Sequence, residues 1–309
     1  MRKEVLPFGI LFLLMISFVL EGCHLKGTGK GDVKVIEKEE NPAEVEVMHR
    51  DSVIFKKLMD WSVENNMASQ SLQDVIVNVG KYFVGSPYVA HTLEKTGPEH
   101  LVINLREFDC TTFVENILAL SLCIKSDQAS LSCFYEKLSD IRYRKGVIDG
   151  YASRLHYFTD WLHDNEEMGL VKVVSNRFGD KELAVNVDFM SAHADKYPKF
   201  AEDSSLVSEM KVHEGRISKL SFRYVSEEKI ESLSDSIQNG DVIALCTSIE
   251  GLDVVHVGLA YHTDSQLSFI HASTVGNKVT ISETGLGEYV RKRKHINGVL
   301  VARPVSWVK

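Results

Sequence analysis

Residues 109 to 124 read Asp109-Cys-Thr-Thr-Phe-Val-Glu-Asn-Ile-Leu-Ala-Leu-Ser-Leu-Cys-Ile124 and decide the fold. Their apolar character, continued over several turns, predicts a buried helix over residues 110–124. Asp109 stands at the N-cap, so Cys110 begins the first turn. Free backbone N–H groups and the helix dipole favour a thiolate there and can hold an oxyanion, so we expect Cys110 to be a nucleophile. The alternative is a small buried apolar residue, which is the common fate of free cysteine.

Further helices and strands are predicted on both sides of this stretch. Apolar residues at helical spacing predict helices over 51–64, 71–83, 132–140 and 153–165. Short apolar runs bounded by Gly, Asn or Asp predict strands over 241–246, 254–262, 268–272, 278–281 and 299–303. Helices followed by a run of antiparallel strands are typical of an α+β domain. Residues 171–236 show no clear pattern and are interpreted as an insertion.

The composition indicates a globular protein and excludes several other classes. The chain has 309 residues, 44% of them hydrophobic, which is enough for a large core and excludes disordered and fibrous proteins. The 35 basic and 43 acidic residues leave a net charge of -8, so we expect no nucleic-acid partner. Five cysteines are too few, and odd in number, for a disulfide scaffold, although a Cys123–Cys133 bridge stays possible.

An N-terminal targeting segment precedes the globular part. Arg2 and Lys3 are followed by an apolar stretch over residues 5–20, which is short for a membrane span and typical of a signal peptide. Leu20-Glu-Gly-Cys23 resembles the lipobox of bacterial lipoproteins, which implies cleavage after residue 22 and lipidation of Cys23. The alternatives are an uncleaved anchor and an ordinary secretory signal. No acidic run follows Cys23, so we expect a lipid-anchored protein of the bacterial cell envelope that faces the periplasm.

The rest of the chain divides into a tether and one domain. Residues 23–48 begin with a glycine-rich run and continue as a polar stretch that cannot fill a core, so they are predicted to form a flexible tether. Residues 49–309 are predicted to form a single domain, which contains the helices, the insertion near 171–236 and the strands.

Two histidines on neighbouring predicted strands are candidates for the base that a thiol nucleophile needs. His256 lies in Val254-Val-His-Val-Gly-Leu259, and His271 lies in Phe269-Ile-His-Ala-Ser273. Because residues on adjacent antiparallel strands lie side by side, both histidines are expected to join Cys110 in a triad. The alternative for each is a hydrogen-bonded structural residue of its strand.

Several motifs, taken in order, carry a resemblance to a known family. They are Gly85-Ser-Pro-Tyr88, Phe108-Asp-Cys-Thr-Thr-Phe-Val114, Asp241-Val-Ile243, His256-Val-Gly-Leu259 and Phe269-Ile-His-Ala-Ser273. They resemble the NlpC-type papain-like peptidoglycan hydrolases. The resemblance implies a papain-like α+β fold, with the nucleophile at a helix start packed on an antiparallel sheet or partial barrel. It further implies Cys110 as nucleophile, His256 as base, His271 as third polar residue and Tyr88 near the nucleophile; the alternative for Tyr88 is a packing aromatic.

A second signature resembles the N-acetylmuramoyl-L-alanine amidase-like branch of that superfamily. It consists of Arg142-Tyr-Arg-Lys-Gly146 and Gly150-Tyr-Ala-Ser-Arg-Leu-His-Tyr-Phe-Thr-Asp-Trp161. The resemblance implies hydrolysis of the amide between muramic acid and L-alanine in peptidoglycan fragments, in wall turnover or recycling. This Cys-His-His mechanism uses no cofactor, and the chain has no H-E-x-x-H or paired C-x-x-C motif, so no metal is expected.

Arg154, Tyr157 and Trp161 are the predicted substrate-binding residues of the 153–165 helix. Their spacing of i, i+3 and i+7 places them on one helix face. Arginine can bind a peptide carboxylate through two parallel hydrogen bonds, and aromatic rings can stack on a sugar. Tyr88 and Asp109 complete the predicted substrate-binding set. The alternative is that the two aromatic residues belong to the core and Arg154 is a solvated or structural charge.

Three other functions remain open. The same triad serves a peptidase that cuts the γ-D-glutamyl bond of the stem peptide, or an acyltransferase on a papain-like frame. An inactive lipoprotein that binds peptidoglycan has no need of all three triad residues. The expected partners are therefore peptidoglycan fragments and, through Cys23, a membrane, and the protein is expected to be a monomer.

Overall fold

The computed structural model describes residues 42–306 except 127–128, with side chains from residue 48 onward. The predicted signal peptide, Cys23 and most of the tether lie outside the described residues. Helix α1 (Pro42–Glu64) begins before residue 49, so the last part of the predicted tether is helical. No helix in the described part of the chain is long and apolar enough to cross a membrane.

Three further helices confirm the predicted boundaries to within two residues. They are α2 (Leu72–Tyr82), α3 (Cys110–Ile124) and α4 (Leu131–Arg142). Helix α3 is buried along nearly its whole length because its apolar side chains meet both α2 and α4. Short 3-10 turns connect the helices at Met67–Ser69 and Arg144–Gly146.

The predicted helix over 153–165 is wrong at its start. Helix α5 runs over Phe158–Glu167, and Tyr151–Ser153 form a 3-10 turn. Arg154 has an extended backbone and bridges to Tyr143 outside the named strands. The bridge between Arg154 and Tyr143 keeps this segment extended, although its residue spacing fits a helix. Arg154, Tyr157 and Trp161 consequently do not share a helix face.

Eight strands form one sheet in the order β2-β3-β8-β4-β5-β6-β7, with β1 also paired to β8. All of these pairings are antiparallel, which confirms the α+β prediction. Helix α10 (Leu286–Arg291) connects the last two strands. The strands are β1 (Val171–Val173), β2 (Lys181–Ala184), β3 (Ser221–Ser226), β4 (Val242–Thr247), β5 (Val254–His262), β6 (Leu267–Ser273), β7 (Lys278–Ile281) and β8 (Ile296–Pro304).

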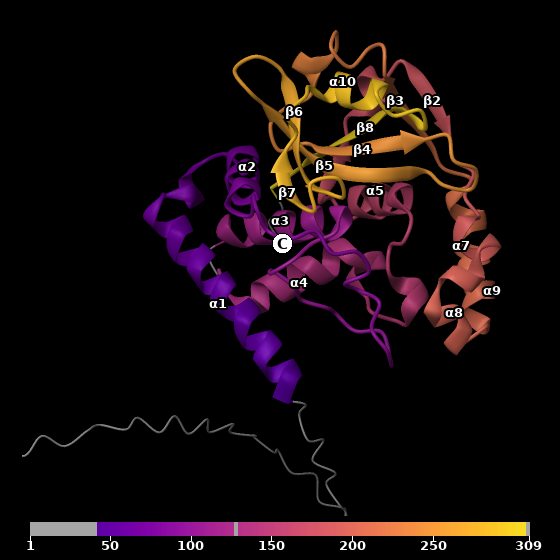
Figure 1. Cartoon of the computed structure of the whole chain (residues 1–309), viewed down its shortest axis with the longest axis horizontal. Helices are drawn as coiled ribbons and strands as arrows, with labels where there is room; N and C mark the ends of the chain where they lie inside the picture. The colour runs from indigo at the N-terminus through magenta and orange to yellow at the C-terminus, as the bar shows by residue number, and fades with distance from the viewer. Residues whose placement is uncertain (1–41, 127–128, 307–309) are drawn as a thin grey trace, which may run out of the picture. The chain divides into compact units, whose positions relative to one another are not determined.

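Helix α3 packs against β5 and β6, which brings the start of the buried helix to the strands that carry the two histidines (Figure 1). The sheet itself is apolar on both sides, because a second cluster of buried side chains covers the face away from α3. The helix and the sheet therefore hold the three candidate catalytic residues on rigid elements.

Part of the region 171–236 belongs to the sheet rather than to an insertion. Strands β1 and β3 pair with β8, and β2 pairs with β3. The longest part of the region outside the sheet lies between β2 and β3. Its helices α7 (Phe189–Ala192), α8 (Pro198–Glu202) and α9 (Ser205–Ile217) gather at one end of the sheet beside α5 (Figure 1).

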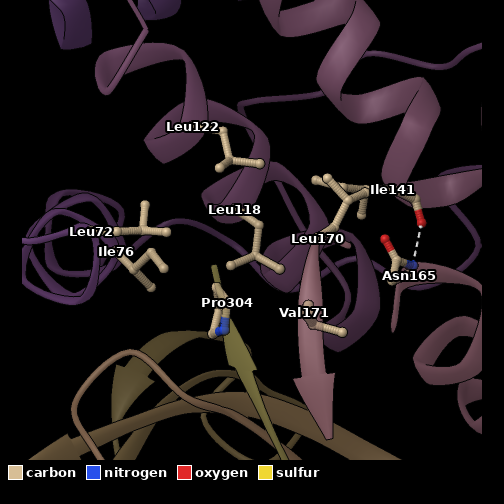
Figure 2. Close-up of a pocket in the computed structure, with 9 residues that line it drawn as sticks. All are labelled: Leu72, Ile76, Leu118, Leu122, Ile141, Asn165, Leu170, Val171 and Pro304. Carbon is tan, nitrogen blue, oxygen red and sulfur yellow. Dashed lines mark hydrogen bonds between the residues drawn. The ribbon is translucent and has the colours of Figure 1, made fainter. Parts of the chain in front are cut away.

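A small apolar cavity of about 10 Å³ lies between the helices and the sheet (Figure 2). Its one amide side chain, Asn165, donates a hydrogen bond to the Ile141 carbonyl oxygen at 3.0 Å. At this size it holds at most one water molecule, so a substrate must bind elsewhere. The lining residues are Leu72, Ile76, Leu118, Leu122, Ile141, Asn165, Leu170, Val171 and Pro304.

Candidate active site

A reciprocal cap fixes the start of α3. The Thr112 N–H donates to the Asp109 carboxylate at 2.7 Å, and the Asp109 N–H donates to the Thr112 hydroxyl at 2.9 Å. This capping box satisfies donors that the helix start leaves free. The predicted N-cap is confirmed, and its effect is to hold Cys110 in place. A contact between Asp109 and the substrate stays a prediction.

The Cys110 thiol is protonated in the free protein at neutral pH. Burial, and next the nearby Asp109 carboxylate, raise its pKa to about 11. Hydrogen bonds from the backbone of Val257 and from Thr111 act in the opposite direction but are weaker. Burial of the sulfur therefore opposes the thiolate that the N–H groups of the helix start favour, and the expected thiolate stays a prediction.

The two histidines meet across neighbouring strands. His256 Nε2 lies 2.7 Å from His271 Nδ1, and the rings are almost perpendicular at 89°. Gly258, two residues after His256, leaves room for β6, and a Cβ there would lie 2.7 Å from Phe269 Cδ2. A Cβ at Gly258 would lie 3.0 Å from the His271 Cβ and 2.8 Å from the Ile270 carbonyl oxygen. The strand pattern correctly predicts that the histidines are neighbours.

Both histidines are neutral at pH 7. Burial, and next the positive charge of Arg293, lower the pKa of His256 to about 4, and burial, His256 and Arg293 together lower that of His271 to about 3. The Arg293 guanidinium lies over the Tyr289 ring at 3.3 Å, and Tyr289 meets the His271 ring at 5.5 Å between centroids. A neutral His256 can accept a proton. Tyr289 and Arg293 were not predicted, because neither stands in a recognisable motif.

A second cavity, of about 210 Å³, is lined by both the candidate nucleophile and the candidate base. Cys110 and Thr111 from the start of α3 line it beside His256 and Val257 from β5. No group of three or more His, Cys, Asp or Glu side chains within the described residues is arranged to hold a metal ion. The other lining residues are Glu94, Tyr151, Leu155, His156, Tyr157, Phe158, Met190, Tyr197, Leu252, Asp253, Val254 and Val255.

The three aromatic residues predicted to contact the substrate lie in different surroundings. Trp161 has 0% exposure and stacks on Phe158, so its ring belongs to the core and the predicted sugar contact is wrong. Tyr157 lines the cavity, but its hydroxyl donates to Glu214 and accepts from the Met190 N–H. Tyr88 is half-buried, and burial and the nearby Cys110 raise its pKa, so it lies near the nucleophile as expected.

Arg154 is not free to bind a substrate carboxylate. Its guanidinium, 6% exposed, donates to Glu94 at 2.8 Å and pairs with Glu99 at 3.5 Å. Because two protein carboxylates already occupy this guanidinium, the predicted role of Arg154 as a clamp is wrong. The arginine instead positions Glu94, which lines the cavity.

The rest of the signature anchors the loop that carries Glu94. Arg142 is buried, donates to Glu115 at 2.6 Å and reaches the Val102 carbonyl oxygen at 2.7 Å. The Tyr143 hydroxyl bonds to Glu99 and to the His100 carbonyl oxygen. These contacts tie the loop over residues 89–107 to α3 and α4. Sequence reasoning missed Glu94 because this loop has no periodicity.

Comparison with known proteins agrees with this geometry. The family of N-acetylmuramoyl-L-alanine amidase-like proteins matches residues 78–299, a range that includes Cys110, His256 and His271. The chain belongs to this family. The predicted amidase-like branch is therefore confirmed. A search of curated sequences found no match.

Solved structures resemble the described fold of this amidase-like protein. An N-acetylmuramoyl-L-alanine amidase from Bacteroides uniformis is 36% identical, with a TM-score of 0.73 over 75% of this chain and 98% of that one. A Bacteroides fragilis protein provisionally assigned as a xylanase is 38% identical, with a TM-score of 0.71 over 74% of this chain and 99% of that one. A Legionella pneumophila protein at 22% identity and a TM-score of 0.64, over 84% of this chain and 96% of that one, shares the fold.

Proposed function

We propose that this protein is a cysteine-dependent N-acetylmuramoyl-L-alanine amidase that acts on peptidoglycan fragments in wall turnover or recycling. The observation that carries the proposal is the cavity lined by both Cys110 and His256, with His271 bonded to His256. Membership of the amidase-like family and the similarity to the Bacteroides uniformis amidase support the substrate class. The bond to be cleaved is the amide between the lactyl group of muramic acid and L-alanine.

The histidine pair decides where the thiol proton goes. His256 Nε2 is engaged with His271 Nδ1, so His256 Nδ1 is the nitrogen left to accept a proton. When neutral His256 carries its proton on Nε2, this N–H donates to His271 Nδ1, and the hydrogen bond keeps the His256 ring in place. The proton moves to His256 as the Cys110 sulfur bonds to the lactyl carbonyl carbon. Backbone N–H groups at the start of α3, including that of Cys110, hold the oxyanion.

Two bond cleavages complete the reaction. The tetrahedral intermediate loses the alanine amine, which takes the proton from His256, and the muramoyl group stays on Cys110 as a thioester. His256 then removes a proton from water, whose oxygen attacks the thioester carbonyl carbon. The carbon–sulfur bond breaks, the sulfur takes the proton from His256 to re-form the thiol, and muramic acid leaves with a free carboxyl group.

Incubation of the purified protein with defined muropeptides tests the proposal. We expect free stem peptide and intact N-acetylmuramic acid, identified by mass spectrometry, and no products from Cys110→Ala. Cleavage inside the peptide would instead support the γ-D-glutamyl peptidase, and cleavage between sugars would support a glycosidase. Absence of any product, with Cys110 unreactive to iodoacetamide, would favour a peptidoglycan-binding lipoprotein.

The proposal includes attachment to the cell envelope through a lipid on Cys23. It is supported by the apolar stretch over 5–20 and the lipobox-like residues that end at Cys23. Two or more acyl chains bind a bilayer stably, so wild type is expected in the membrane fraction and Cys23→Ser in the soluble fraction. Equal distribution of both proteins would reject the anchor without affecting the enzymatic proposal.

A further inference from the structure

One oxygen of the cavity wall is buried without a protein partner. Glu94 Oε1 accepts a hydrogen bond from Arg154, but Oε2 has no hydrogen-bond partner among the described residues although it is buried. A buried unpartnered carboxylate oxygen is costly to maintain. Glu94 lines the cavity that contains Cys110, so its carboxylate belongs to the cavity wall, next to any molecule bound there.

A second unpartnered group lies at the same end of the cavity. Tyr151 is 4% exposed, and its hydroxyl has no hydrogen-bond partner within the described part of the chain. Its ring lies over the Arg154 guanidinium at 4.9 Å, and the charge of Glu94 raises the pKa of the Tyr151 hydroxyl after burial. Glu94 and Tyr151 are therefore neighbours, and together they offer an acceptor and a donor.

Charge at this end favours a neutral donor group over an anion. Glu94 and Glu99 face the single guanidinium of Arg154, so one negative charge within this trio is not balanced. Stem-peptide carboxylates are repelled by it, whereas the hydroxyl and acetamido N–H groups of an amino sugar are attracted. The ring of Tyr197, which packs on Phe200 near Tyr151, adds an aromatic surface suited to a sugar face.

The size of the cavity argues against a cationic stem-peptide side chain as the occupant. The amine of a stem diamino acid lies two residues beyond the L-alanine of the scissile amide. Glu94 and Cys110, by contrast, line one cavity of about 210 Å³. The sugar is attached directly to the lactyl group that Cys110 attacks, so it is the part of the substrate that this cavity can hold together with the scissile carbonyl.

We infer that Glu94 and Tyr151 bind the N-acetylmuramoyl sugar, with Glu94 Oε2 accepting a sugar N–H or O–H and the Tyr151 hydroxyl donating to a sugar oxygen. The inference rests on the proposed amidase function for the identity of the sugar. It makes Glu94 and Tyr151 specificity-determining residues, and it makes Arg154 a positioning residue that holds Glu94.

Calorimetric binding to Cys110→Ala protein tests the inference without turnover. The probes are N-acetylmuramoyl-L-alanine and a stem tripeptide that contains a diamino acid. Adding Tyr151→Phe is expected to weaken binding of the muramoyl probe about tenfold, and Glu94→Gln more, because charge-assisted hydrogen bonds are stronger. Binding of the tripeptide is expected to stay the same.

Matched variants separate binding from folding. Tyr151→Phe removes a hydroxyl that has no partner in the described residues, so its unfolding midpoint is expected to equal or exceed that of wild type. Glu99→Gln removes a carboxylate from the same Arg154 outside the cavity lining but leaves Glu94 itself unchanged, so we expect a smaller loss of affinity for the muramoyl probe than in Glu94→Gln. Equal losses in Glu94→Gln and Glu99→Gln would overturn the inference.

The remaining outcomes test the sugar site and the amidase function separately. An unchanged Kd for the muramoyl probe in both Tyr151→Phe and Glu94→Gln would overturn the sugar site, and a loss confined to the tripeptide would assign Glu94 to the stem amine instead. Release of alanine from N-acetylmuramoyl-L-alanine by protein with intact Cys110 reports separately on the amidase function. Binding that depends on Glu94 without alanine release would keep the sugar site and reject the amidase.

Discussion

The two ends of the candidate active-site cavity are built in different ways. The thiol end takes Cys110 from α3, His256 from β5 and the supporting His271 from β6, and all three groups are uncharged at pH 7. The other end takes Glu94 from a loop and Tyr151 from a 3-10 turn, and an ion-pair cluster around Arg154 holds it.

The difference between the two ends matches two proposed roles: the reaction at the thiol end and recognition of the substrate at the other end. The proposed proton transfer from Cys110 to His256 needs distances held by rigid elements, and α3 and the sheet supply them. Recognition needs unpaired polar atoms aimed at a ligand, and loops held by buried charges supply those. Each of the following predictions tests one side of this comparison.

Loss of the nucleophile is expected to have the largest effect. Cys110→Ala removes the only group proposed to bond to the substrate, so kcat should fall about 10⁴-fold or more in an alanine-release assay. Cys133→Ala is the matched control, because Cys133 lies half-buried on α4 away from the cavity lining and should leave kcat unchanged. Turnover retained by Cys110→Ala would show that Cys110 is not the nucleophile.

Breaking the buried ion pair should cost the most stability. Arg142→Met leaves the Glu115 carboxylate, 2% exposed, without its partner, and is expected to lower the free energy of unfolding by about 3–5 kcal/mol. Urea unfolding measures it. The double variant Arg142→Met with Glu115→Leu should recover much of the loss, since no charge is left buried. A loss below about 1 kcal/mol in the single variant would show that the pair does not anchor the loop of Glu94.

A methyl group at Gly258 should disturb the thiol end without removing any functional group. Its Cβ would meet the Ile270 carbonyl oxygen at 2.8 Å and the His271 Cβ at 3.0 Å. Gly258→Ala is therefore expected to cost about 1–3 kcal/mol of stability and to lower kcat about 100-fold by displacing His271. Gly276→Ala, whose nearest neighbour would lie at 3.8 Å, is the control. Wild-type kcat in Gly258→Ala would contradict the role given to the histidine contact.

The pH dependence of alkylation reports on the protonation of Cys110 and changes neither the stability nor the structure of the thiol end. Because the pKa of Cys110 is raised to about 11, its thiolate fraction grows about tenfold per pH unit below that value. The rate of reaction with iodoacetamide should rise throughout pH 7–10, with Cys110→Ala as the blank. A rate that levels off below pH 8 would instead indicate a thiolate–imidazolium pair already present in the free protein.

The thiol end could be predicted from sequence because its residues stand in periodic elements. The N-cap at Asp109, the apolar helix over 110–124 and the two apolar strands each leave a local pattern. The protonation state of Cys110 could not be predicted, because burial of the sulfur depends on β5, far along the chain. Trp161 was misassigned for a similar reason: its spacing fits a helix face, but the helix begins only at Phe158.

The sequence by itself determined the α+β class, the helix that begins at Cys110 and the pair of strands that carry His256 and His271. Those features depend on local hydrophobic periodicity and capping, which neighbouring residues decide. Only the tertiary structure decided that Arg154 faces Glu94 and Glu99 instead of a substrate, and that Glu94 and Tyr151 share a cavity with Cys110. Such contacts join segments some 60 residues apart, and their partners are chosen by burial and charge, which no local pattern records.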